Sequence, residues 1–400
     1  MRRGLVGVAS VVCLASLAPL ALWGDREQEP TSQSDLRQRY LLLSTIKTST
    51  MQEELDTAAA AGYRAVVGAR TGSSEFAVLL EKVAQPPEVY EYRLLATTRT
   101  STMQEELNDA AADGFHILSR VMMGGQSEIV VLLERPPGPP LYSEYLLLAT
   151  ELTGTLHAEL AQAAAQGWNL LGMVRAEEKV GLSGEHIVTL GRAADIPRVP
   201  GVASLTELRE RYLGLATRRT ATMQKELAEA AKKGYRVVTA SPTSGTELEI
   251  IMEKQAEPAD AFEYKLIATN RASTLQKELN EEARRGFRLL PQALVGKRGA
   301  GSSGWGSLLG VAGGTVTIPG MVPDEIVAVL ERAPESTTRY QYLVLDTMRT
   351  STMQEEISTT VSEQAYKVAA MAGGPTPEEA TPLGVMAALR IVLEKELEDQ

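Results

Sequence analysis

The sequence is poor in cysteine: Cys13 is the only one in 400 residues. It lies within an apolar stretch near the N-terminus, so the rest of the chain has no thiol. This excludes a disulfide framework and catalysis by cysteine in the remainder of the protein. Stability must therefore come from the packing of apolar side chains.

Histidine is also scarce, and familiar catalytic motifs are missing. His116, His157 and His186 have no second histidine three or four residues away, the spacing that places two metal ligands on one helix face. The chain contains neither a G-x-S-x-G nor an H-E-x-x-H pattern. We therefore predict no catalytic residues, no metal site and no cofactor, and a protein that is not an enzyme.

Runs of basic residues are absent as well, and the formal net charge is −11 at pH 7. Proteins that bind nucleic acid carry clustered lysine and arginine side chains, and anionic membrane surfaces attract the same clusters. The sequence thus disfavours DNA, RNA and an anionic membrane surface as partners. The remaining candidates are a protein or another component of the cell envelope.

One apolar stretch stands out at the N-terminus. Residues 4–23 carry no charge and follow Arg2 and Arg3, which is typical of a signal peptide or an uncleaved anchor over residues 1–24. The sequence leaves open which of the two it is. It predicts an exported protein, periplasmic or extracellular, that contacts a membrane only if residues 4–23 remain as an anchor.

The chain is rich in repetition. The motif Thr-Ser-Thr-Met-Gln-Glu-Glu-Leu, or a variant of it, begins at Thr48, Thr100, Thr153, Thr220, Ala272 and Thr350. The fourth copy follows the first at the same interval at which the fifth follows the second. Such nesting indicates that a block of three units was duplicated, and repeats of this kind stack against their neighbours to bury a shared core.

The repeats define the expected domain organisation. We expect a lead segment over residues 25–39, a first block over 40–192, a Pro-rich linker over 193–211 and a second block over 212–397. The units of the two blocks are expected at about 40–82, 90–135, 142–192, 212–254, 262–332 and 340–397.

The second copy shows the pattern of one unit. Residues 90–97 begin with the alternation of a half-buried strand. The spacing of Thr102 and Glu105 is that of a capping box, which predicts a helix that starts there and has Gln104 and Asn108 facing water. Gly114 predicts the end of that helix.

Two apolar runs, 115–121 and 128–134, follow the helix and are separated by residues 122–127, which is typical of a hairpin. The last run is apolar on both faces, so we expect a central strand in the order one, three, two. The predicted fold class is α+β, with six tandem β-α-β-β units, each an antiparallel or mixed three-stranded sheet with one helix. In the last copy Ala365 replaces the glycine, which predicts a frayed or differently closed helix end.

The units resemble a known family. An aromatic-Glu-Tyr-basic opening, a helix end that reads Gly-aromatic and an aliphatic run closing on Glu-Arg or Glu-Lys are similar to the bacterial domain-of-unknown-function 4177 family. Residues 262–267 and 167–171 carry the likeness best. The resemblance implies a β-α-β-β fold and brings no catalytic or ligand residues, and the family does not string six copies together.

Two features are candidate binding sites. Arginines precede four of the helices, at Arg99, Arg219, Arg271 and Arg349. Helix N-termini attract anions, but capping side chains use the same amides, so we expect caps here. The second feature is the Gly-rich loop 296–320 with Trp305; its G-x-G-x-x-G pattern lacks the strand and helix of a dinucleotide site.

These observations favour an exported, non-catalytic binding or assembly scaffold of the cell envelope or exterior, because repeats present similar surfaces in series. The alternative is a binder of a small ligand or glycan through loop 296–320 or the helix N-termini.

Overall fold

The computed structural model describes residues 37–71, 75–83, 90–125, 128–136, 138–176, 185–193, 209–242, 247–255, 262–297, 325–347, 349–375 and 387–397. These ranges contain six helices and eighteen strands. The N-terminal segment 1–24, Cys13 and Trp305 lie outside the described residues. No helix in the described ranges is long and apolar enough to cross a membrane.

Each unit contributes one strand, one helix and two further strands. The first three units are β1 (Tyr40–Thr45), α2 (Thr48–Ala60), β2 (Tyr63–Thr71) and β3 (Glu75–Lys82); β4 (Glu91–Thr97), α3 (Thr100–Ala112), β5 (His116–Gly125) and β6 (Glu128–Arg135); and β7 (Tyr142–Thr150), α4 (Thr153–Ala165), β8 (Asn169–Ala176) and β9 (Glu185–Ala193).

The last three units repeat this order. They are β10 (Tyr212–Thr217), α6 (Thr220–Lys232), β11 (Tyr235–Pro242) and β12 (Leu248–Lys254); β13 (Glu263–Thr269), α7 (Ala272–Ala283), β14 (Arg288–Lys297) and β15 (Glu325–Arg332); and β16 (Arg339–Thr347), α8 (Thr350–Gln364), β17 (Lys367–Pro375) and β18 (Ala387–Leu397). The predicted α+β class and β-α-β-β unit are confirmed.

Every unit forms its own three-stranded antiparallel sheet, with its third strand in the centre. In the first unit, for example, β3 pairs with β1 on one side and with β2 on the other. The predicted strand order one, three, two is therefore confirmed. A right-handed crossover through the helix accounts for it, because it leaves a gap that the returning third strand fills.

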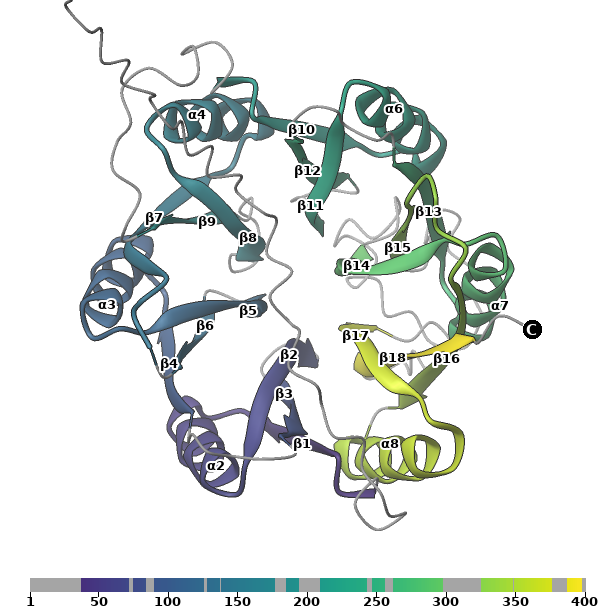
Figure 1. Ribbon diagram of the computed structural model, residues 1–400. Coiled ribbons are helices and arrows are strands. Elements are labelled where there is room, and N and C mark those ends of the chain that lie inside the picture. Colours follow the sequence, from purple (N-terminus) through teal and green to yellow (C-terminus); the bar gives the residue numbers. More distant parts are fainter. Residues whose placement is uncertain are drawn as a thin grey trace, which may run out of the picture.

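The six units close into a ring (Figure 1). The helices form the perimeter, and the second strands β2, β5, β8, β11, β14 and β17 lie nearest the centre. Each helix packs against the first strand of the following unit, and α8 packs against β1. The last unit thus contacts the first as the others contact their successors. Every unit therefore packs against a neighbour on both sides.

The hydrophobic cores lie between units. Each of the six clusters of buried side chains combines the helix and sheet of one unit with the sheet of the next. In β6, Val130 and Leu132 face α2 of the preceding unit, whereas Val131 and Leu133 face their own helix α3. This explains why the third strands are apolar on both faces.

The helices start differently from the prediction. The N-cap residue of α3 is Arg99, its side chain makes no capping hydrogen bond, and the helix begins at Thr100. The capping box at Thr102 and Glu105 was therefore wrong. Instead the hydroxyl oxygen of Thr97, at the end of the strand, accepts a hydrogen bond of 3.3 Å from the amide of Arg99. Equivalent threonines do the same in all six units, a turn that competes with capping at this position.

The helix ends follow the prediction in five units, where glycine takes the left-handed conformation after the helix. The sixth helix ends differently, as predicted: α8 is two residues longer than α3, and its C-cap residue Ala365 itself takes the left-handed conformation, with φ of 56°, whereas Asp113 stands between α3 and its glycine.

An Ala365→Gly variant should be more stable than the wild type by about 0.5–1 kcal/mol. A left-handed alanine costs about 1–2 kcal/mol, and the greater freedom of glycine in the unfolded chain offsets part of the gain. Urea denaturation would measure the difference. A matched Gln364→Gly variant, one residue earlier and inside the helix, should lose up to about 1 kcal/mol; a loss in both variants would contradict the strain at Ala365.

The second strands are longer than predicted and irregular. β5 continues to Gly125, so Met122 and Met123 belong to the strand and not to the turn. The register of every second strand shifts once against its neighbour, at Val66, Leu118–Val121, Leu171, Val238, Leu290–Ala293 and Ala369. These β-bulges add residues to the strand without ending the pairing.

All six units present the same end of their sheets to the same side of the ring. Within a unit, the helix begins beside the turn from the second to the third strand, because Thr97 pairs with Ile129 and Gly125 pairs with Glu128. Since the units pack through equivalent contacts, these ends gather on one face. We call it the hairpin face.

Candidate functional site at the interface between the third and fourth units

Neighbouring units share a common set of polar contacts. The candidate site lies at the interface that differs from this set. In five units a glutamine of the helix reaches the first strand of the next unit: Gln52, Gln104, Gln224, Gln276 and Gln354. Gln52, for instance, donates to the carbonyl of Tyr92 at 2.9 Å and accepts from the amide of Leu94 at 2.8 Å. These side chains form hydrogen bonds with backbone groups at the open edge of the first strand. Gln104 and Asn108 were wrongly predicted to face water, since both bind β7.

A tyrosine of each first strand reaches back to the preceding unit. Tyr40, Tyr92, Tyr145, Tyr212, Tyr264 and Tyr342 each accept a hydrogen bond from the amide that precedes a bulge. The bulge releases this amide from the ladder, and the hydroxyl supplies its partner. Burial raises the pKa of all six tyrosines, that of Tyr212 to about 12, so the hydroxyls remain protonated.

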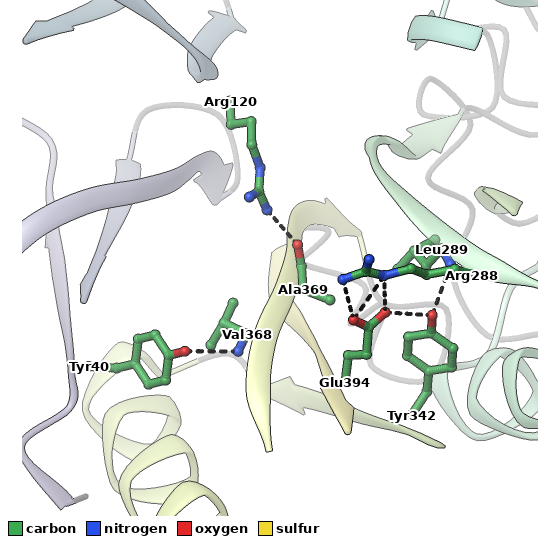
Figure 2. A network of polar contacts seen from close by, with 8 residues as sticks. All are labelled: Tyr40, Arg120, Arg288, Leu289, Tyr342, Val368, Ala369 and Glu394. Atoms are coloured by element: carbon green, nitrogen blue, oxygen red, sulfur yellow. Dashed lines mark hydrogen bonds and ion pairs between the residues drawn. The ribbon is translucent and has the colours of Figure 1, made fainter. Parts of the chain in front are cut away.

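Three interfaces add to this tyrosine an arginine–glutamate ion pair, in which the glutamate is the more buried partner. In Figure 2, Arg288 binds both carboxylate oxygens of Glu394, which also accepts a hydrogen bond of 2.7 Å from Tyr342. Glu134 and Glu331 are held in the same way by Arg64 and Arg236. The carboxylates are thus neutralised by arginine at any pH near neutrality.

One contact joins units that are not neighbours. Arg120, in the bulge of β5, donates a hydrogen bond to the carbonyl oxygen of Ala369 in the bulge of β17 (Figure 2). Burial lowers the pKa of Arg120. The second and sixth units are therefore braced across the inner side of the first.

The interface between the third and fourth units departs from the common pattern. His157 replaces the helix glutamine, and its imidazole faces Gly214 where the other units have leucine or valine. A β-carbon on Gly214 would lie 1.8 Å from Nε2 of His157, so the ring needs the space that this glycine leaves. Glu249 and His186 stand at positions that are apolar in most other units.

These three side chains meet in the interior. Glu249 is fully buried and His186 is 1% exposed, whereas the side chain of His157 is 32% exposed. Nε2 of His157 donates to one carboxylate oxygen of Glu249 at 2.9 Å. Nδ1 of His186 lies 3.0 Å from the other oxygen, an ion-pair distance without the alignment of a hydrogen bond.

The electrostatics of Glu249 follow from these contacts. Burial alone would raise the pKa of this carboxyl, but its contacts with His157 and His186 outweigh burial and hold the pKa below its usual range. An ionised carboxylate inside a protein requires a nearby cation. Among the described residues, the side chains that form ion-pair contacts with Glu249 are the imidazoles of His157 and His186.

The cluster can bind and release protons, but it contains no nucleophile. Within the described residues, no group of three or more histidine, cysteine or acidic side chains is arranged to hold a metal ion. The neighbouring hydroxyl of Ser241 is buried and donates to the carbonyl oxygen of Pro242. The arrangement therefore fits a charged carboxylate held by two imidazoles better than it fits a catalytic site.

The predicted binding arginines are not brought together. Arg99, Arg219, Arg271 and Arg349 are exposed N-cap residues of four different helices around the hairpin face. Arg99, Arg219 and Arg349 form no ion pair with any residue that the structure describes. β14 extends through Lys297, so the loop predicted at 296–320 starts within a strand, and its two flanking strands end on the same face.

Sequence reasoning missed the cluster because it searched for metal spacing within one segment. The signal lay in the alignment of the six copies. His157, His186 and Glu249 each break a position that is glutamine or apolar in most other copies, and a polar residue at an otherwise apolar core position requires a partner.

A scan against models of known protein families finds no match to this chain, and a search of curated proteins likewise finds no similar sequence.

Proposed function

We propose that the protein is a non-catalytic binding or assembly scaffold that acts in the cell envelope or outside the cell. The observation that carries the proposal is the use of the repeated residues. The glutamines and tyrosines of the repeat are engaged between units, so repetition serves to build the ring. A ring that lacks a catalytic constellation among its described residues is suited to presenting surfaces to partners.

The hairpin face is the proposed binding surface. The units differ most between their second and third strands, from residues 126–127 in the second unit to 298–324 in the fifth. Exposed Arg99, Arg219 and Arg349 are N-cap residues of helices that begin at this face. Variable loops on a rigid frame commonly carry binding functions. The proposal of export is supported by the apolar segment 4–23 that follows Arg2 and Arg3.

A pulldown from envelope extracts with residues 25–400 tests this proposal. We expect a partner that is retained by the wild type and lost when residues 298–324 are replaced by the short turn Gln126-Ser127, or when Arg99, Arg219 and Arg349 are changed to glutamate. The matched control is Lys232→Glu with Lys233→Glu, at the opposite end of α6, which should retain the partner. Loss of the partner in the control alone, or equal capture by every variant, would exclude the hairpin face.

A further inference from the structure

The interface between the third and fourth units joins the two halves of the ring through a buried carboxylate between two imidazoles. We propose that this interface is pH-sensitive: it is most stable while Glu249 is ionised and His157 or His186 carries a proton, and it loosens when either charge is lost. Such a device goes beyond binding at the hairpin face and needs no partner.

The first support is the coordinated change of residues. Glu249 occupies a position held by Ala77, Val130, Ile187 and Val327 in four other units and by Arg390 in the sixth. His186 occupies a position that is apolar in all the others: Phe76, Ile129, Leu248, Ile326 and Leu389. The acid and its two bases come from two different units, so the charges meet only when the units are in contact.

The second support is the identity of the cation. At three other interfaces arginine neutralises the buried glutamate, and arginine keeps its charge at every pH near neutrality. Histidine side chains as a class change charge between pH 5 and 8. Neutral imidazoles would leave the buried carboxylate of Glu249 without a cation among its described ion-pair contacts, which is costly in an interior. Alkaline conditions therefore weaken this interface and spare the arginine-paired ones.

Acid acts through Glu249 itself. Because its pKa is lowered in the folded protein, the stability that the ionised carboxylate supplies is complete above the ordinary carboxyl range, near 4.5, and is lost as the pH falls further. Protonated Glu249 would leave charged imidazoles facing each other in the interior. The interface is thus most stable in mildly acidic solution.

Several side chains of the described residues surround Glu249 and its two histidines. α4 contributes His157 and β9 contributes His186; β10 and β11 place neutral Ala216 and Ser241 beside Glu249. Arg175 of β8 is the cross-strand neighbour of His186, and its guanidinium keeps its charge at every pH near neutrality. Directly before β12, Glu247 pairs with Arg218 at 3.3 Å.

Hydrogen exchange measured on residues 25–400 tests the proposal. The amides of β12 are compared between wild type and a variant that restores the common pattern, His157→Gln with Gly214→Leu, His186→Ile and Glu249→Val. We expect the ratio of wild-type to variant exchange rates to rise about tenfold between pH 6 and pH 8.5. A tenfold change is the effect on an equilibrium constant of a pKa difference of about one unit. The same ratio for β6, at the arginine-paired interface, should stay constant.

A Glu249→Gln variant keeps the shape of the side chain and provides a second test if the fourfold variant does not fold. It too should remove the pH dependence. Proton NMR of the three histidines offers a direct readout: the pH dependence of the His157 and His186 signals should differ between the wild type and Glu249→Gln, and that of the His116 signals should not. A constant exchange ratio, or His157 and His186 signals with the same pH dependence in the two proteins, would overturn the proposal.

Discussion

Replacing Glu134 with alanine should lower the free energy of unfolding by about 3–5 kcal/mol, the usual effect of removing one partner of a buried ion pair. Glu134 is fully buried and binds two nitrogens of Arg64 as well as the hydroxyl of Tyr92. Its loss removes the carboxylate that binds two nitrogens of Arg64, whose side chain is only 24% exposed. Urea denaturation of residues 25–400 would measure the change.

The matched control for this variant is Glu91→Ala in the same sheet. Glu91 pairs with Arg135, but both side chains are largely exposed. Exposed ion pairs contribute about 0–1 kcal/mol, so this variant should be close to wild type. Equal losses in the two variants would show that burial of the pair at the interface does not determine its contribution.

Replacing Leu79 with alanine should cost about 2–5 kcal/mol, the range for truncating a buried leucine. Leu79 is fully buried in the core where the sixth unit meets the first, together with Met353 and Ile357 of α8. The cavity should therefore open the ring at its closing contact. Limited proteolysis should then cut within α8 before it cuts within α3.

The control for Leu79→Ala is Ile46→Ala. Ile46 precedes α2 and is 65% exposed, so its truncation should change the stability by no more than about 0.5 kcal/mol. A Leu79 variant as stable as the Ile46 variant, or one cleaved first in another helix, would contradict a closing contact that depends on this core.

The unit could be predicted from the sequence because its signals are local. The alternation before each helix, the apolar stripe and the glycine behind it correspond to the strand, helix and left-handed end found in the structure. The doubly apolar third strand correctly indicated a central position. The helix start was mispredicted because Thr102 was expected to cap the helix. The helix already begins at Thr100, and the hydroxyl of Thr97 forms the turn before it.

The ring and the candidate site could not be predicted in this way, because both depend on contacts between units. The pattern of one helix alone places Gln104 on a water-facing side, yet Gln104 binds the first strand of the next unit. His157 and Glu249 are ninety-two positions apart in the chain and meet only through the packing of α4 on the fourth unit. Chain spacing carries no information about that distance.

The closing contact between α8 and β1 has a consequence for assembly. Every unit offers a helix to its successor and a strand edge to its predecessor, so the contact is head-to-tail and the ring ends only because rotation from unit to unit completes a circle. A chain of three units would expose one unsatisfied helix and one unsatisfied strand, and two such chains related by a twofold axis would satisfy both. The repeat intervals indicate a duplicated block of three units, and the ring corresponds to such a homodimer joined into one chain.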